Sequence, residues 1–117
     1  MKKILMLLVL MIFAECSYAG FKSGNDLVTN MVEFEKAEND QSNGKLINWY
    51  SFGAYLGYVI GVADATDSII WCAPEHITQG QIAKVVAKYL GNHPEKLHLS
   101  ATSLVIESLI STFPCKK

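Results

Sequence analysis

Arginine is absent from this chain of 117 residues, and all ten of its basic residues are lysines. The formal net charge at pH 7 is -1, and no basic cluster is present. Nucleic-acid-binding domains are basic, and arginine is the side chain that recognises phosphate and guanine through two parallel hydrogen bonds. The composition therefore argues against a nucleic-acid partner and, for the same electrostatic reason, against attraction to anionic lipid.

Recognisable catalytic motifs are also absent. The sequence has no glycine-rich phosphate loop, no nucleophile elbow and no HExxH zinc motif. Residues that could form a carboxylate pair, a cysteine–histidine pair or a metal site are better explained as solvated surface positions or as half of a disulfide. They are Asp64, Asp67, Cys72, Glu75, His76, His93, Glu95 and His98. We therefore expect a protein without enzymatic activity, bound metal or cofactor.

Charge-free segments, in contrast, are prominent, because 50% of the residues are hydrophobic. The first segment, residues 4–14, follows two lysines and leads to the small residues Ser17 and Ala19, which is the arrangement of a secretory signal peptide. We expect cleavage near Ala19, which makes residues 1–19 the signal peptide and leaves residues 20–117 as one exported domain. This domain has 8 lysines and 10 carboxylates, a net charge of -2.

Cys16 lies near the end of the signal peptide and raises the alternative of a lipid anchor. A lipid-acceptor cysteine needs a small residue before it, whereas Glu15 is charged and bulky, so we reject lipidation. Cys72 and Cys115 then remain, and two cysteines in an exported chain most simply form one disulfide. A crosslink between residues 43 positions apart would stabilise the fold by about 4 kcal/mol on the loop-entropy model. We predict an exported protein with one disulfide.

The first part of the exported domain has a helical pattern. Ser23 is followed three residues later by Asp26, which is the spacing of a capping pair. Apolar residues then recur at helical spacing, so the pattern predicts a first helix over residues 24–38. The polar residues 39–44 contain no apolar side chain and predict a loop.

The central segment, residues 46–63, contains no charged residue, and we expect its helix to continue as far as Trp71. Gly53, Gly57 and Gly61 fall at four-residue spacing and share one face of this helix. Each glycine destabilises a helix interior by about 1 kcal/mol relative to alanine, so three on one stripe suggest that another backbone approaches closely. A membrane-spanning helix is the alternative. The segment is short for that role and carries polar and aromatic residues that are poorly suited to the centre of a bilayer, so we interpret it as the buried centre of a soluble domain.

Two further helix boundaries follow from local signals. Pro74 has no backbone donor and disfavours helical geometry at the preceding residue, so it stops the central helix. Thr78 and Gln81 form a capping box that begins another helix, and an apolar stripe follows it. Gly91 stands where a left-handed C-cap would end this helix.

The remaining residues predict one more helix. Pro94 indicates a turn or a short helix start, Ser100 caps the last helix, and Pro114 ends it. No convincing strand is present. The sequence therefore predicts an all-α, single-domain bundle of about four to five helices with one disulfide.

Several separated motifs in the second half agree in order and spacing with a known family. They are Tyr-Val-Ile-Gly-Val-Ala-Asp at 58–64, Trp-Cys-Ala-Pro at 71–74, Ile-Thr-Gln-Gly-Gln at 77–81, Val-Val-Ala-Lys-Tyr-Leu at 85–90 with His-Pro close behind, and Phe-Pro-Cys at 113–115. With these motifs, residues 23–115 resemble the Rap/Tai family of type VI secretion amidase immunity proteins.

The resemblance implies an exported, periplasmic, mainly helical protein that is often homodimeric. It implies that the protein binds a peptidoglycan amidase injected by a competitor or sibling cell and occludes the cysteine-peptidase cleft without any chemistry of its own. Family members often carry a second cysteine pair that joins the first helix to the central helix. Here the first helix has no cysteine, and Tyr55 occupies the corresponding region of the central helix.

The inhibitory contacts do not carry over from the family, because immunity surfaces differ with the effector that they recognise. Loops on a rigid scaffold can enter a cleft, so we predict partner contacts in the two loops that flank the third helix. The predicted partner-binding residues are Pro74, Glu75, His76, Asn92, His93 and Glu95. The alternative is that both loops are plain connectors, and the alternative function is a periplasmic helical adaptor or envelope-stress protein.

Overall fold

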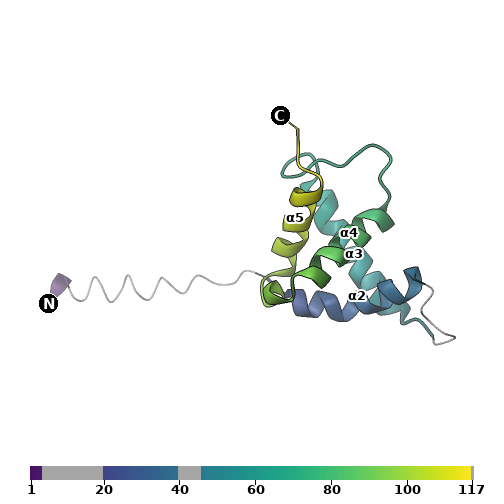
Figure 1. Ribbon diagram of the computed structural model, residues 1–117. Helices are drawn as coiled ribbons and strands as arrows, with labels where there is room; N and C mark the ends of the chain where they lie inside the picture. The colour runs from purple at the N-terminus through teal and green to yellow at the C-terminus, as the bar shows by residue number, and fades with distance from the viewer. Residues whose placement is uncertain (4–19, 40–45, 117) are drawn as a thin grey trace.

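The computed structural model describes residues 1–3, 20–39 and 46–116, so the predicted signal peptide falls almost wholly outside the described residues (Figure 1). The described chain forms four long helices and one short 3₁₀ helix: α2 (Gly24–Glu38), α3 (Trp49–Thr66), α4 (Gln79–Asn92), η1 (Pro94–Lys96) and α5 (Ala101–Thr112). Only two isolated β-bridges and no strand occur among these residues. The prediction of an all-α domain is confirmed.

All four α-helices contribute to one hydrophobic core. Its fully buried side chains include one large aromatic residue from each of α2 and α3 and several aliphatic residues from α4 and α5. The core residues are Leu27, Met31, Phe34, Tyr55, Val59, Ile60, Ala63, Trp71, Ile82, Ala83, Val86, Ala87, Leu90, Ala101, Leu104, Val105 and Leu109. Each helix therefore buries one face in a shared centre, which leaves the opposite faces to solvent.

Aromatic side chains hold α2 against α3, the two helices that a second cysteine pair often joins in the family that the sequence resembles. The ring of Phe34 lies 5.1 Å from that of Tyr55 and 5.6 Å from that of Phe52. The Tyr55 hydroxyl donates a hydrogen bond of 2.7 Å to the carbonyl oxygen of Ala83 on α4. Burial, with a smaller contribution from the negative charge of Glu35, raises the pKa of Tyr55, so the hydroxyl stays protonated and remains a donor. Tyr55 thus links three helices without a covalent bond.

The starts of α2 and α5 are pinned together by the main chain. The Gly24 amide donates to the Leu99 carbonyl, and the Ala101 amide donates to the Lys22 carbonyl, both at 2.9 Å. A side chain at Gly24 has no room, because a Cβ there would lie 2.5 Å from a Leu104 methyl carbon. The prediction that Ser100 caps α5 is correct in position, but the Ser100 side chain makes no capping hydrogen bond. The Ala101 amide at the start of α5 instead donates to the Lys22 carbonyl of the neighbouring segment.

The central helix is shorter than the sequence predicted. It ends at Thr66, and residues 67–71 form a tight turn in which Ser68 has a φ of 61°. The reason is the side chain of Trp71, which is only 1% exposed and must turn back into the core. Burial of a tryptophan side chain stabilises the fold more than a few additional helical hydrogen bonds would. The packing of Trp71 therefore overrides helix propensity.

The glycine stripe does not lie where we expected it. Gly53, Gly57 and Gly61 are exposed, and apart from the adjoining residues and backbone of α3 itself, no described atom lies within 4 Å of a Cβ built on any of them. The buried face of α3 is instead the one that carries Tyr55 and Val59. The close backbone approach predicted for the stripe is therefore absent within the described part of this chain. None of its helices is long and apolar enough to cross a membrane.

Gly91 does not act as the C-cap of α4. The helix continues through Gly91 to Asn92, and the C-cap is His93, with φ -126° and ψ 57°. Pro94 disfavours the helical region for the residue before it, which ends the helix at His93 without any left-handed residue. The predicted capping boxes of Ser23 and Thr78, in contrast, are both present and begin α2 and α4 at the expected positions.

Candidate functional site

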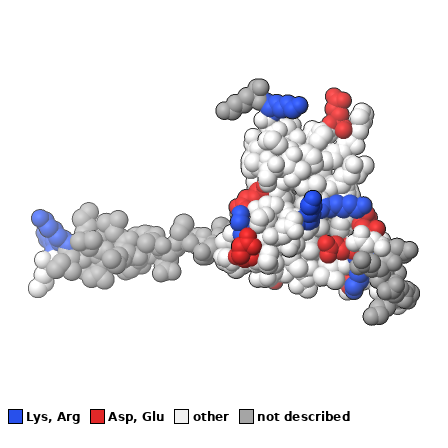
Figure 2. Space-filling view, viewed as in Figure 1, with Lys and Arg blue, Asp and Glu red and all other residues white. Residues whose placement is uncertain are grey.

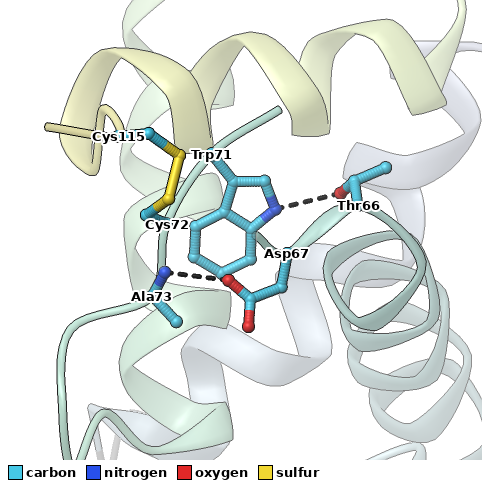
Figure 3. Close-up of a disulfide and its surroundings, with 6 residues drawn as sticks. All are labelled: Thr66, Asp67, Trp71, Cys72, Ala73 and Cys115. Atoms are coloured by element: carbon cyan, nitrogen blue, oxygen red, sulfur yellow. Dashed lines mark hydrogen bonds between the residues drawn. A yellow bond between two sulfur atoms is a disulfide. The ribbon is translucent and has the colours of Figure 1, made fainter. Parts of the chain in front are cut away.

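The turn after α3 is held by side chains on both of its sides (Figure 3). The indole nitrogen of Trp71 donates to the Thr66 hydroxyl at 2.9 Å, and a carboxylate oxygen of Asp67 accepts from the Ala73 amide at 2.9 Å. The Ser68 amide donates to the Trp71 carbonyl at 2.8 Å. The carboxylate of Asp67 thus orders the backbone that leads into the next loop.

The disulfide between Cys72 and Cys115 joins this turn to the residues that follow α5. Figure 3 shows the two sulfur atoms beside the Trp71 ring. The Cys72 amide also donates to the Phe113 carbonyl at 3.0 Å, and the rings of Trp71 and Phe113 lie 6.1 Å apart. The loop after α3 and the C-terminal segment therefore form one connected unit at the same end of the molecule (Figure 1).

The first predicted contact loop extends from this unit. Pro74, Glu75 and His76 are all exposed, and His76 has a positive φ of 62°. A non-glycine residue in this left-handed region is destabilised by roughly 1–2 kcal/mol, and such a conformation persists only when its surroundings enforce it. Here the disulfide restrains one side of the loop and the Thr78 capping box restrains the other. Both ends of the loop are thus restrained.

The second predicted contact loop lies at the other end of α4. The His93 ring stacks on Tyr89 with 4.3 Å between centroids, and its Nδ1 lies 3.0 Å from a Glu95 carboxylate oxygen. The hydrogen bond from His93 lowers the pKa of Glu95. Glu95 projects from η1 and lines none of the hollows described below, whereas His93 lines one of them.

A polar network holds this second loop against α5. The Tyr89 hydroxyl donates to a Glu107 carboxylate oxygen at 2.7 Å, and the Lys96 ammonium donates to the same oxygen at 3.1 Å and to the Tyr89 hydroxyl at 3.2 Å. The hydrogen bonds from Tyr89 and then Lys96 lower the pKa of Glu107, so this carboxylate is ionised at neutral pH. Burial, followed by the bond to Glu107, raises the pKa of Tyr89.

Three adjoining hollows on the surface connect the two loops. Their volumes are about 480, 410 and 390 Å³, and they share lining residues: Pro74 and Phe113 border the first and second, Val85 the second and third, and Thr112 the first and third. We call this continuous depression between α4 and the end of α5 the α4–α5 groove. Of the six predicted contact residues, all except Glu95 line it.

Lysines border the α4–α5 groove along its whole length. Lys116 lines the first hollow, Lys84 the second and Lys88 the third, whereas Glu75 is the one carboxylate among these lining residues. Lys84 pairs with Glu38 of α2 at 2.7 Å. Figure 2 shows basic side chains near the C-terminus and at mid-height, with a broad uncharged area between them.

Neither the lysines nor the floor of this groove was predicted from the sequence. Lys84 and Lys88 are four residues apart on α4, and this spacing places them on one face of the helix. The spacing is visible in the sequence. Phe113 and Lys116 line the groove because the disulfide holds the C-terminal segment in place. No local sequence pattern predicts their position. Within the described residues, no group of three or more His, Cys, Asp or Glu side chains is arranged to hold a metal ion.

Comparison with known proteins supplies the family. No curated protein matches the chain. The family model described as Rap1a immunity proteins matches residues 23–115, which include every helix from α2 to α5. Immunity proteins of this family are non-enzymatic inhibitors, so the expectation that the chain is not an enzyme is confirmed. Because the match covers most of the sequence, the chain belongs to the Rap1a immunity protein family.

Proposed function

We propose that the protein is a periplasmic immunity protein that binds and sterically inhibits a type VI secreted peptidoglycan amidase. The observation that carries this proposal is the match of residues 23–115 to the Rap1a immunity proteins. The amidase would act on the cell wall, so its inhibitor must be present in the same compartment. The proposed signal peptide over residues 1–19 would deliver it there, and a disulfide suits an oxidising environment.

Inhibition requires only that the protein occupy the substrate cleft of the amidase. The loop with Pro74, Glu75 and His76 lines the second hollow of the α4–α5 groove, and the turn with Asn92 and His93 lines the third hollow. Both loops are already ordered in the free chain by the disulfide and by the Tyr89 network. Ordering before binding reduces the entropic cost of association, which favours the tight complex that an inhibitor of a turning-over enzyme needs.

We also propose that two copies pair through α3. The surface involved is the glycine face, which we define by Trp49, Gly53, Gly57, Gly61 and Ala65. All five residues are exposed, and Trp49 is 67% exposed. A hollow of about 380 Å³ borders the face at its C-terminal end, with two of these glycines and the alanine among its lining residues.

A two-fold axis through Gly57 would make this face self-complementary. In an antiparallel pair, Gly53 faces Gly61 of the second copy, and Trp49 faces Ala65. The exposed indole then enters the hollow beside the small residues, and the lack of large side chains at the three glycines and Ala65 lets two backbones approach. This arrangement gives the exposed glycines the close partner that they lack in a single chain.

Protection of living cells tests the immunity function. Cells that produce the full chain together with a periplasmically directed amidase from the adjacent reading frame should survive, and the two purified proteins should co-elute. A matched variant without residues 1–19 should still bind in vitro and fail to protect. Normal lysis together with the absence of any complex would overturn the proposal. An envelope-stress defect in a deletion strain with unchanged amidase sensitivity would favour the adaptor function instead.

A further inference from the structure

We propose that the α4–α5 groove binds an extended, acidic segment of the amidase. This inference rests on the proposed function and adds to it the chemistry of the segment that the groove receives. Each of the three hollows that make up this groove has a lysine among its lining residues.

The shape of the groove selects an extended chain. It follows α4 from Gln81 to Asn92, and α4 as a whole has a length of about 21 Å at 1.5 Å per residue. An extended segment covers about 3.3 Å per residue, so roughly six residues would fill the groove. The floor offers the apolar surfaces of Val85 and Phe113, against which alternate side chains of such a segment can pack.

The charge of the groove selects an acidic chain. Helix α4 carries Lys84 and Lys88 and no acidic residue, and Lys116 borders the opposite end. Lys84 is paired with Glu38, whereas neither Lys88 nor Lys116 forms an ion pair with another described residue. Since the exported domain as a whole has a net charge of -2, these lysines stand out against the rest of the molecule. Opposite charges across an interface speed association and set the register of the partner.

The borders of the groove are held before any partner arrives. The disulfide anchors the border formed by Cys72 and Lys116, and the bond between Tyr89 and Glu107 anchors the border at the other end. Lysine side chains on a fixed frame lose less conformational freedom on binding than lysines on a mobile loop, so their charges act at defined positions.

Charge reversal in the groove tests the inference. The variant with both Lys88→Glu and Lys116→Glu should bind the amidase about tenfold more weakly at low salt, mainly through slower association, and the difference should shrink at high salt. The control is Lys22→Glu, which reverses one partly buried lysine beside Tyr58 on another part of the surface. It should change the dissociation constant less than twofold. Equal effects of the two variants would overturn the inference while leaving the proposed function intact.

Crosslinking identifies the occupant directly. A photoreactive benzoylphenylalanine at Val85 should capture an amidase peptide that contains several Asp or Glu residues, and reversing those residues to lysine should restore binding to the Lys88→Glu, Lys116→Glu variant. Capture of a neutral or basic amidase segment, or of a second copy of this chain, would overturn the inference. A wild-type protein that forms no complex with any amidase would remove the proposed function itself.

Discussion

The α4–α5 groove and the glycine face of α3 differ in shape, charge and the way in which each is held. The groove is concave and edged by Lys84, Lys88 and Lys116, and a disulfide and a polar network fix its borders. The glycine face carries no lysine, has Asp64 beside Gly61 and belongs to one regular helix. A lysine-edged groove suits a partner of different sequence and opposite charge, whereas a face with a large residue at one end and small ones at the other suits a second copy.

Removal of the disulfide should produce the largest difference between the two surfaces in their binding. The double variant Cys72→Ser, Cys115→Ser should lose about 4 kcal/mol of unfolding free energy, because the crosslink spans 43 residues. A urea titration measures this loss. Under conditions where the variant is still folded, amidase affinity should fall and the dissociation constant of the dimer should stay unchanged, since neither cysteine belongs to α3. Equal weakening of both associations would mean that the surfaces are not independent.

A large side chain on the glycine face should disrupt only pairing. Gly61→Leu would fill the hollow that the Trp49 ring of a second copy enters, and overpacking of this kind weakens association by about 1–3 kcal/mol. Sedimentation velocity should show monomers at concentrations where the wild type is dimeric, with amidase binding retained. Gly91→Leu is the matched control, since Gly91 is also an exposed helical glycine with open space around its Cβ position. A dimer that survives Gly61→Leu would contradict the pairing through α3.

Loss of one hydroxyl should loosen the far border of the groove. Tyr89→Phe removes the hydrogen bonds that join Tyr89 to Glu107 and Lys96, which should lower the unfolding free energy by about 1 kcal/mol. Hydrogen exchange of the amides in η1 should become faster, whereas exchange in α3 should not change. Unchanged protection in η1 would show that the network does not hold this turn.

The smallest effect should appear in the pH dependence of stability. In the folded state, the hydrogen bonds from Tyr89 and Lys96 lower the pKa of Glu107. This carboxylate therefore stabilises the fold at pH values above its unfolded pKa of about 4.5. The stabilisation disappears as the pH falls through the lower pKa of the folded state. Urea titrations of the wild type and of Glu107→Gln between pH 6 and pH 3 measure it. The variant should show a weaker decline of stability with acid. Parallel curves would exclude Glu107 as a source of this dependence.

Helix starts were predictable where a side chain caps its own helix. Ser23 and Thr78 each form a capping box with a residue three positions later, and both predicted starts are correct. The interaction is complete within four residues, so no distant part of the fold is needed to recognise it. The capping role assigned to Ser100 failed in part, because the free amide at that helix start bonds to Lys22, which is remote in sequence.

The candidate site was predictable only in its separate pieces. The loops around His76 and His93 were recognised from proline and turn signals, and both border the groove. Their connection through Val85 and Phe113 depends on how α5 packs beside α4, for which the sequence holds no local pattern. The end of α3 was missed for the same reason, because the burial of Trp71 decides it.

The sequence by itself determined the all-α class, the capped starts of α2 and α4, the cysteine pair and the family resemblance, since each depends on residues close together in the chain or on motifs in a set order. The tertiary structure alone decided which face of α3 is buried. Before Asp64 this helix has no charged residue to mark its exposed side, so the packing of Tyr55 and Val59 against the other helices decided which side is buried. The same packing placed the three groove lysines along one depression and left the glycines open.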